Sequence, residues 1–211
     1  MENILEVKGV GKNFGGFTAL SDVNLSIRKG ERLGLIGPNG SGKTTLISCI
    51  SGALQNDGGT IRFNGESIET LPAYARTRRG IARSFQIPRP FASMTVLENL
   101  MVPLAYVGGL SGSKARAQGL EILDEMGLAE KAESSSASLS QVELRKMELA
   151  RAMAAKPQLL ISDEAMAGLS GSEVDDVLDI LIKLNKQGIT IIMIEHIMHA
   201  VMRFSERIIC L

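Results

Sequence analysis

The sequence predicts an α/β fold built on a mostly parallel sheet, with an N-terminal antiparallel β part and an inserted helical lobe. Three observations lead to this prediction. Towards the C-terminus, strand-length apolar runs alternate with helical patterns, which is typical of parallel β-α-β units. The first 35 residues show strand-like alternation, whereas residues 88–156 show helical periodicity and no strand-like run. We therefore expect a single domain, with residues 1–87 and 157–211 as its core and residues 88–156 as its helical lobe.

Length and composition limit the possible functions. The chain has 211 residues, of which 45% are hydrophobic, enough for one domain with a sizeable core. Its 23 basic and 23 acidic residues give a net charge of zero, which argues against a protein that depends on non-specific contact with nucleic acid. The sequence shows no apolar run of the roughly 18–20 residues that a membrane-spanning helix needs, and no signal-peptide core at its start. Two cysteines without CxxC spacing exclude a disulfide framework and argue against structural zinc, so we expect an intracellular protein.

The N-terminal part begins with strands. Leu5 and Val7 alternate with polar neighbours, the same alternation recurs over residues 23–27, and residues 28–30 (RKG) are typical of a turn. A short apolar run at residues 33–36 then ends at a Gly-rich loop. The order that follows is strand, Gly-rich loop and helix.

The loop carries the strongest chemical motif of the chain. Its residues are Gly37, Pro38, Asn39, Gly40, Ser41, Gly42, Lys43, Thr44 and Thr45. They fit the pattern G-x-x-x-x-G-K-[ST] in the strand-to-helix context that this motif requires, which disfavours the alternative of a Gly-rich turn with a stray lysine. Backbone N–H groups of such a loop surround phosphates, Lys43 reaches the β- and γ-phosphates, and the Thr44 hydroxyl can hold Mg²⁺.

The C-terminal part predicts further buried strands and a helix. Strand candidates are residues 159–162, 189–194 and 207–211. Between them, residues 172–188 show one apolar helical face, and Gly188 suits the helix C-cap. This alternation predicts that the strands are parallel, with their carboxyl ends at one edge of the sheet.

Acidic residues follow the first of these strands. Asp163 and Glu164 would lie at the edge where the phosphate loop also lies. We expect Asp163 to assist in holding Mg²⁺ and Glu164 to polarise the attacking water. Two acids after an apolar run are by themselves more often a turn with a helix N-cap, and only the upstream loop favours the catalytic interpretation.

Two more polar residues are candidates on the same edge. His196 follows the strand candidate at 189–194, where a contact with the γ-phosphate is favoured over a surface role, whereas His199 keeps the surface or packing interpretation. Gln86 follows a strand-like run and could reach Mg²⁺ or the lytic water through its carboxamide. A single glutamine has little specificity by itself.

Together these residues resemble the ATP-binding subunits of ABC transporters, over essentially the whole chain. The resemblance assigns Gln86 to the Q-loop, His196 to the switch histidine and residues 139–152 (LSQVELRKMELARA) to the signature helix, whose Ser140 contacts ATP. It also places Phe14 where an aromatic ring stacks on adenine; packing in the core is the alternative for this residue.

The resemblance implies a phosphate-loop NTPase fold and an ATPase that uses ATP and Mg²⁺. It further implies partner transmembrane permease subunits, a homo- or heterodimer of ATPase subunits, an indirect role for a solute-binding protein, and a peripheral position at the cytoplasmic face of the membrane. Nucleic acid is not an expected partner. The stretches GGFTAL, FQIPRPFASMTVLENLMV and AMAGLS look most like the importers of branched-chain amino acids and related amides.

The sequence departs from the family pattern at its signature. Gln141, Val142 and Glu143 stand where the family has Gly-Gly-Gln after Leu-Ser. In this family the signature of one subunit caps the ATP of the other, and the added side chains would obstruct that approach. Glu143 also completes the pattern S-x-x-E with Ser140, which predicts a capping box that turns the Ser140 hydroxyl towards the helix.

Other departures are Ala165 in place of a proline, Ser170 in place of a frequent aspartate, and an end at Leu211, before strands and helices that the family normally adds. Residues 70–97 contain five arginines and no acidic residue at all. We expect a solvated basic face, with a surface towards lipid headgroups or the membrane subunits as the alternative. These arginines are Arg76, Arg78, Arg79, Arg83 and Arg89.

Three functions remain open at this point. The first is an ATPase that powers solute import through membrane subunits. The second is a nucleotide-gated subunit that hydrolyses ATP poorly because of its altered signature and acts with a competent partner. The third, a soluble phosphate-loop kinase or nucleic-acid ATPase, has no acceptor-site motif in its favour, and the neutral charge argues against it.

Overall fold

A computed structural model describes residues 2–85 and 88–211 of the chain. Its central sheet has five parallel strands in the order β6 (Ile81–Ser84), β7 (Leu159–Asp163), β8 (Thr190–Ile194), β3 (Arg32–Ile36) and β9 (Arg207–Cys210). Strands β7 and β8 are buried along their whole length, which explains their continuous apolar runs. The carboxyl ends of all five strands meet at one edge, as the sequence predicted.

A second sheet is antiparallel. Its order is β2 (Phe17–Arg28), β1 (Asn3–Phe14), β4 (Gly58–Phe63) and β5 (Glu66–Ser67). The alternation in the first 35 residues predicted β1 and β2. It did not predict β4 and β5, because β4 begins with two glycines and buries only Ile61 and Phe63.

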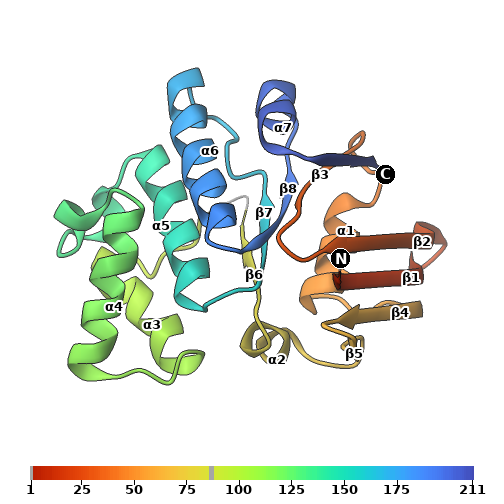
Figure 1. The fold of residues 1–211 in the computed structure, drawn as a ribbon, viewed down its shortest axis with the longest axis horizontal. Coiled ribbons are helices and arrows are strands. Elements are labelled where there is room, and N and C mark those ends of the chain that lie inside the picture. The colour runs from red at the N-terminus through yellow and green to blue at the C-terminus, as the bar shows by residue number, and fades with distance from the viewer. Residues whose placement is uncertain (1, 86–87) are drawn as a thin grey trace.

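Seven α-helices lie in the described part of the chain. They are α1 (Lys43–Ser51), α2 (Ala73–Arg78), α3 (Val96–Tyr106), α4 (Gly112–Glu125), α5 (Gln141–Ala154), α6 (Gly171–Lys186) and α7 (Met198–Phe204). Helices α3, α4 and α5 lie together on one side of the parallel sheet (Figure 1), in the region predicted to be a helical lobe. Within residues 2–85 and 88–211, no helix is both long and apolar enough to cross a membrane.

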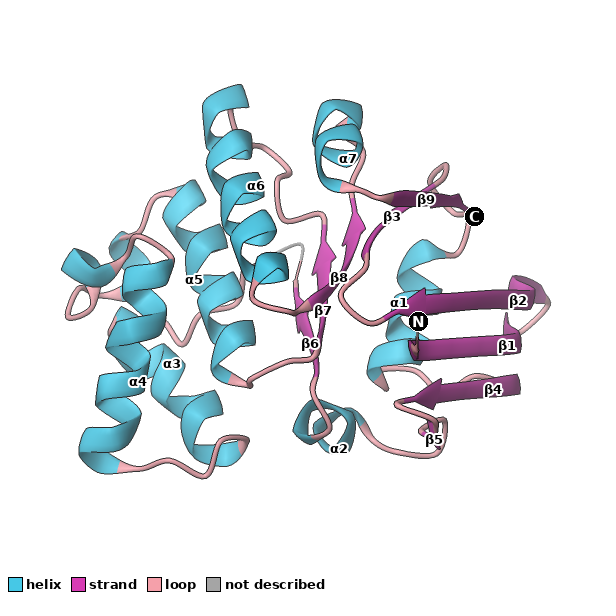
Figure 2. Ribbon diagram, in the orientation of Figure 1, coloured by secondary structure: helices cyan, strands magenta, loops and turns pink. Residues whose placement is uncertain are grey.

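The parallel sheet separates two hydrophobic clusters. Alternate residues of β8 point to opposite sides: Ile191 and Met193 join the cluster formed with α3–α7, whereas Ile192 and Ile194 join the cluster formed with α1 and the antiparallel sheet. Helix α1 therefore lies between the two sheets (Figure 2). This packing fixes the start of α1, and with it the Gly-rich loop, at the carboxyl edge of the parallel sheet.

The arginines of residues 70–97 do not form one solvated face, so that expectation was wrong. Arg76 is only 1% exposed and donates hydrogen bonds to the carbonyl oxygens of Cys49 and Ile50. These carbonyls belong to the C-terminal turn of α1, where the helix itself supplies no donors. Burial lowers the pKa of Arg76. Arg83 is also largely buried, with 12% of its side chain exposed.

Candidate functional site

The Gly-rich loop connects the end of β3 to the first turn of α1. Gly42 is the residue before the helix, at a left-handed φ of 96°, and a Cβ atom there would lie 2.6 Å from the carbonyl oxygen of Ala19. Only glycine fits this position. Gly42 has no side chain that could accept a hydrogen bond from the first turn of α1. The first N–H groups of this helix are therefore left for another partner at the loop. Such a turn, with the positive end of the helix dipole, suits an anion.

Lys43 closes the loop from inside. Its Nζ donates hydrogen bonds to the carbonyl oxygens of Gly37 and Pro38, each at 2.8 Å, and only 6% of the residue is exposed. The ammonium group is thereby held over the loop. The buried Ser41 Oγ has no hydrogen-bond partner in the part of the chain that the structure describes. The loop thus brings together an ammonium group, a hydroxyl and the first N–H groups of a helix, which are the kinds of donor that bind a polyphosphate.

A cavity of about 330 Å³ opens beside this loop. Residues 39–45 line one side of it, Glu164 lies at another side, and Phe14 and Phe17 complete it. The two aromatic residues face each other across the β1–β2 hairpin and are 47% and 62% exposed, so packing in the core is ruled out for them. An aromatic pair that lies exposed beside a phosphate loop could hold a nucleotide whose base stacks on Phe14 and whose phosphates lie at the loop.

A second cavity, of about 400 Å³, adjoins the first at Thr44. Asp163 also lines it, so both metal ligands predicted from the sequence and described by the structure share one cavity. Mg²⁺ in phosphate chemistry needs one or two protein ligands and takes the others from phosphate and water, which Thr44 and Asp163 fit. The described residues contain no cluster of three or more His, Cys, Asp or Glu side chains that could hold a metal without such help. Gln86, the third predicted ligand, lies outside the described residues.

Asp163 carries a partner that the sequence did not reveal. Its Oδ2 lies 2.5 Å from Nη2 of Arg83, on the neighbouring strand β6. The other nitrogen of this guanidinium, Nη1, donates to Ser48 Oγ at 3.3 Å. An arginine therefore lies in the cavity where the magnesium ligands were expected.

Glu164 and His196 lie at the same edge of the sheet, as predicted, and they are also in contact with each other. His196 Nε2 lies 3.2 Å from Glu164 Oε1, because β7 and β8 are neighbours and both residues lie just beyond their carboxyl ends. Glu164 has a left-handed φ of 47°, and its N–H donates to the carbonyl oxygen of Ile194 at 2.9 Å. Such a backbone is costly for a residue with a Cβ and is typical of functional sites. His199 lies on the surface and pairs with Asp175, in agreement with the surface or packing role expected for it.

Glu195 is a site residue that the sequence analysis missed. It is 3% exposed, and its Oε1 accepts a hydrogen bond of 2.9 Å from the N–H of Met166, which holds the segment after Glu164 against the end of β8. Burial raises the pKa of Glu195. The available signal was an acidic residue directly after a fully apolar strand, the same arrangement that pointed to Glu164.

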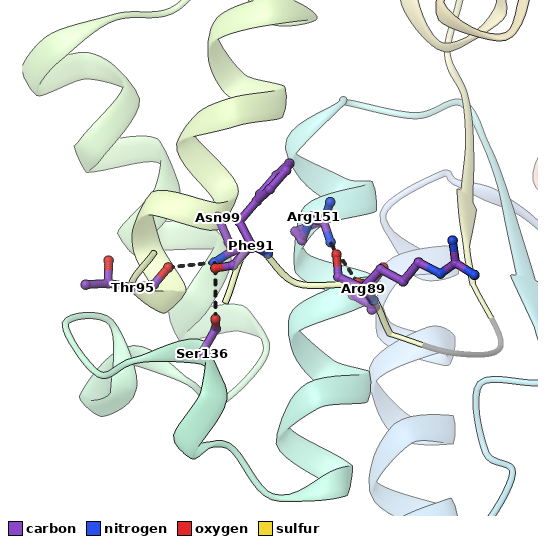
Figure 3. A network of polar contacts seen from close by, with 7 residues as sticks. Arg89, Phe91, Thr95, Asn99, Ser136 and Arg151 are labelled. Atoms are coloured by element: carbon purple, nitrogen blue, oxygen red, sulfur yellow. Dashed lines mark hydrogen bonds and ion pairs between the residues drawn. The ribbon is translucent and has the colours of Figure 1, made fainter. Parts of the chain in front are cut away.

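The segment that follows Gln86 is tied to the helices α5 and α3 (Figure 3). The N–H of Arg89 donates to Glu148 on α5, and Arg151, one turn further on, donates to both Glu148 and the Arg89 carbonyl. Two residues on, the N–H of Phe91 donates to Asn99 of α3 at 2.8 Å. These bonds connect the second cavity, which Arg89, Glu148 and Arg151 also line, to the helical side of the molecule.

The predicted capping box is present at the start of α5. Ser140 Oγ accepts from the N–H of Glu143 at 3.3 Å, and Glu143 Oε2 accepts from the N–H of Ser140 at 2.8 Å. This backbone hydrogen bond lowers the pKa of Glu143. Neither residue lines either of the two cavities.

The sequence and the fold of the chain match those of known proteins over almost the whole chain. The pattern of the ABC transporter family matches residues 20–167. The chain is 38% identical to BraF, the high-affinity branched-chain amino acid transport ATP-binding protein of Pseudomonas aeruginosa, across 98% of this chain and 87% of that protein. It is 37% identical to the corresponding protein LivG of Escherichia coli K12, across 97% of this chain and 86% of that protein.

Solved structures agree with these relatives. The crystal structure of the ADP conformation of MJ1267, an ATP-binding cassette of an ABC transporter, has a TM-score of 0.91 and 30% identity, and covers 100% of this chain and 88% of its own. A dimeric post-hydrolysis state of the ATP-binding cassette MJ0796, bound to ADP and phosphate, has a TM-score of 0.88 and 29% identity, and covers 98% of this chain and 94% of its own.

Proposed function

Because the chain belongs to the ABC transporter family, as an ATP-binding subunit with ATPase function, we propose that it powers the import of branched-chain amino acids or related amides. The observation that carries its chemistry is the cavity in which the phosphate loop, Phe14 and Glu164 meet, with His196 3.2 Å from the Glu164 carboxylate. The similarity to BraF and LivG supports the solute class.

The proposed mechanism is in-line attack of water on the γ-phosphate. The loop N–H groups and Lys43 bind the phosphates and stabilise the charge that develops in the transition state. Thr44 and Asp163 would hold Mg²⁺, which neutralises charge on the β- and γ-phosphate oxygens when bound. Glu164 orients the attacking water, and His196, beside it, contacts the γ-phosphate. Phe14 stacks on the adenine ring.

Subunits of this family act with transmembrane permeases and dimerise. For this chain we propose a homo- or heterodimer of ATPase subunits at the cytoplasmic face of the membrane, attached through permease partners and served indirectly by a solute-binding protein. The division into a core of residues 1–87 and 157–211 and a lobe of residues 88–156 remains a prediction.

Uptake by membrane vesicles tests the proposed transport. Vesicles that contain the chain, its permease partners and its solute-binding protein should accumulate labelled leucine only when MgATP is present on the side of the chain. ATP hydrolysis without uptake of leucine, isoleucine, valine or a related amide would reject the solute class and leave the ATPase in place. No ATP hydrolysis in the complete assembly would reject the enzymatic proposal as well.

The capping box favours a second candidate, a subunit that binds nucleotide but completes a poor site on its partner. The N–H of Ser140 donates to the Glu143 carboxylate and is therefore not available to a phosphate of the partner's site, and its Oγ is turned towards its own helix, where it accepts from the N–H of Glu143. Loss of one preorganised donor to a transition-state oxyanion costs roughly 2.7–4 kcal/mol, a factor of about a hundred to a thousand. A homodimer would contain two such sites, whereas a partner with an intact signature would leave one good site.

Restoring the signature is expected to separate the two candidates. The combined change Gln141→Gly, Val142→Gly and Glu143→Gln should raise the ATPase rate of the homodimer at least about tenfold, a barrier change of about 1.4 kcal/mol. Glu98→Gln is the matched control, because it weakens a similar capping box on α3, between Thr95 and Glu98. A homodimer that already turns over at about one per second, and stays within about threefold after the triple change, contradicts the second candidate.

A further inference from the structure

We propose that Arg83 is an internal counter-cation of the ATP site, which neutralises Asp163 in the absence of metal and gives up this carboxylate when Mg²⁺ binds with the nucleotide. The inference rests on the proposed function, because it requires a metal and a nucleotide at Thr44 and Asp163. It concerns how this chain balances the charge of its own metal ligand, a role that the mechanism above leaves open.

The first support is the contact itself. Arg83 Nη2 and Asp163 Oδ2 are 2.5 Å apart, and only 12% and 6% of the two side chains are exposed. Arg83 lies on β6 opposite Ile161 of β7, two residues before Asp163, so the backbone of two paired strands holds the charges together. A pair in such a position is weakly screened, and each charge depends on the other for its neutralisation.

The second support is the place of the guanidinium group. Arg83, Asp163 and Thr44 line the same cavity of about 400 Å³, so the arginine shares the cavity with both expected metal ligands. Two cations that both contact one carboxylate, even at its two different oxygens, repel each other strongly. Mg²⁺ bound by Thr44 and Asp163 must therefore displace or weaken the contact with Arg83.

The third support is that the guanidinium group is held only in part. Its Nε is buried and has no hydrogen-bond partner among the described residues, and its second hydrogen bond, to Ser48, is long at 3.3 Å. The guanidinium carbon lies 5.3 Å from the centre of the exposed Phe85 ring, a favourable position for a cation. When Asp163 binds a metal, Arg83 can keep its contacts with the Phe85 ring and the Ser48 hydroxyl.

It follows that Arg83 reduces the extent to which bound metal raises the affinity for nucleotide. Without metal, Arg83 cancels the charge of Asp163, so the phosphates of a nucleotide do not face an unpaired carboxylate. With metal, Arg83 competes for the charge of the same carboxylate. Removal of the arginine charge should thus weaken metal-free nucleotide binding and preserve or strengthen metal-dependent binding.

Calorimetric titration with ADP, once with excess Mg²⁺ and once with EDTA, measures this coupling. In Arg83→Met the ratio of ADP affinity with Mg²⁺ to that with EDTA should rise at least about tenfold, mainly through weaker binding in EDTA. In Arg83→Gln the ratio should also rise. This variant serves as a safeguard against misfolding, because its amide can still donate a hydrogen bond to Asp163 while it carries no charge. By linkage, the affinity of the ADP-bound chain for Mn²⁺, measured by electron paramagnetic resonance, should rise by the same factor.

Two further variants sharpen the result. Arg207→Met is the matched control: it breaks an ion pair of the same 2.5 Å length with the buried Glu31, at the amino edge of the sheet, and should leave the ratio unchanged. Asp163→Asn combined with Arg83→Met should abolish the increase, because no carboxylate remains for the metal.

An equal loss of ADP affinity with and without Mg²⁺ in both Arg83 variants would show a structural role and overturn the inference. An unchanged ratio would overturn it too, as would an equal rise in Arg207→Met. If the unmodified chain binds ADP in neither condition, the proposed function fails first, which is a different result from a chain that binds ADP without the expected change in ratio.

Discussion

Replacement of Lys43 by alanine is expected to abolish ATP hydrolysis and to weaken MgATP binding. Lys43 Nζ is fixed by two hydrogen bonds of 2.8 Å to loop carbonyls, so its charge is positioned in advance for the β- and γ-phosphates. Alanine removes a charge-assisted donor where negative charge develops, and the expected loss is about a hundred- to a thousandfold in rate or more. Steady-state turnover and ATP titration measure the two effects separately.

Lys8→Ala provides the control for this prediction. It removes an equal charge from the exposed part of β1, where Lys8 pairs with Glu6 at 3.2 Å, and should change neither quantity. Normal ATP affinity and turnover in Lys43→Ala would remove the phosphate-loop assignment.

Glu164→Gln is expected to retain ATP binding while it slows hydrolysis by on the order of a hundredfold or more. Glutamine has nearly the shape of glutamate and can keep a hydrogen bond to His196, but it cannot polarise water as a carboxylate does. The phosphate contacts of the loop are untouched, so the ATP-bound dimer should accumulate. Single-turnover kinetics and size-exclusion chromatography with ATP measure these two outcomes.

The matched change Glu206→Gln, at a side chain that is 50% exposed and paired with Arg32, should leave the rate as it is. Hydrolysis at the parent rate in Glu164→Gln would mean that Glu164 serves only the local backbone. Its left-handed φ of 47° would then need a different explanation.

Local pattern was sufficient for much of the fold and the site. The phosphate loop, the strands β3, β7 and β8, and the meeting of Glu164 with His196 follow from short motifs and from the rule that parallel strands end at one edge. The Ser140 capping box was also predicted, because its two members are three residues apart on one helix.

Contacts between distant segments were not predictable in the same way. Arg76 was expected at the surface because its residue type is charged, yet it satisfies the end of α1, 26 and 27 residues earlier in the chain. Arg83 was grouped with it, although the pairing of β6 with β7 places it beside Asp163, 80 residues away. Sequence periodicity reports which face of an element is apolar, and it does not report which polar group from another element lies there.

The strand order has a consequence for how the protein folds during its synthesis on the ribosome. Strand β3, which precedes the phosphate loop, pairs with β8 and β9, both of which are made long after the loop itself. The N–H of Leu211 donates to the Ile36 carbonyl at 3.0 Å, and the Leu211 carbonyl lies against Gly37, so even the first loop residue has its support there. Closing such long loops is slow because their entropy is lost before the contacts form. A nascent chain should thus acquire nucleotide binding only after β8 and β9 have been made, and cellular ATP, by binding only the finished sheet, should draw intermediates that lack these strands towards the native state.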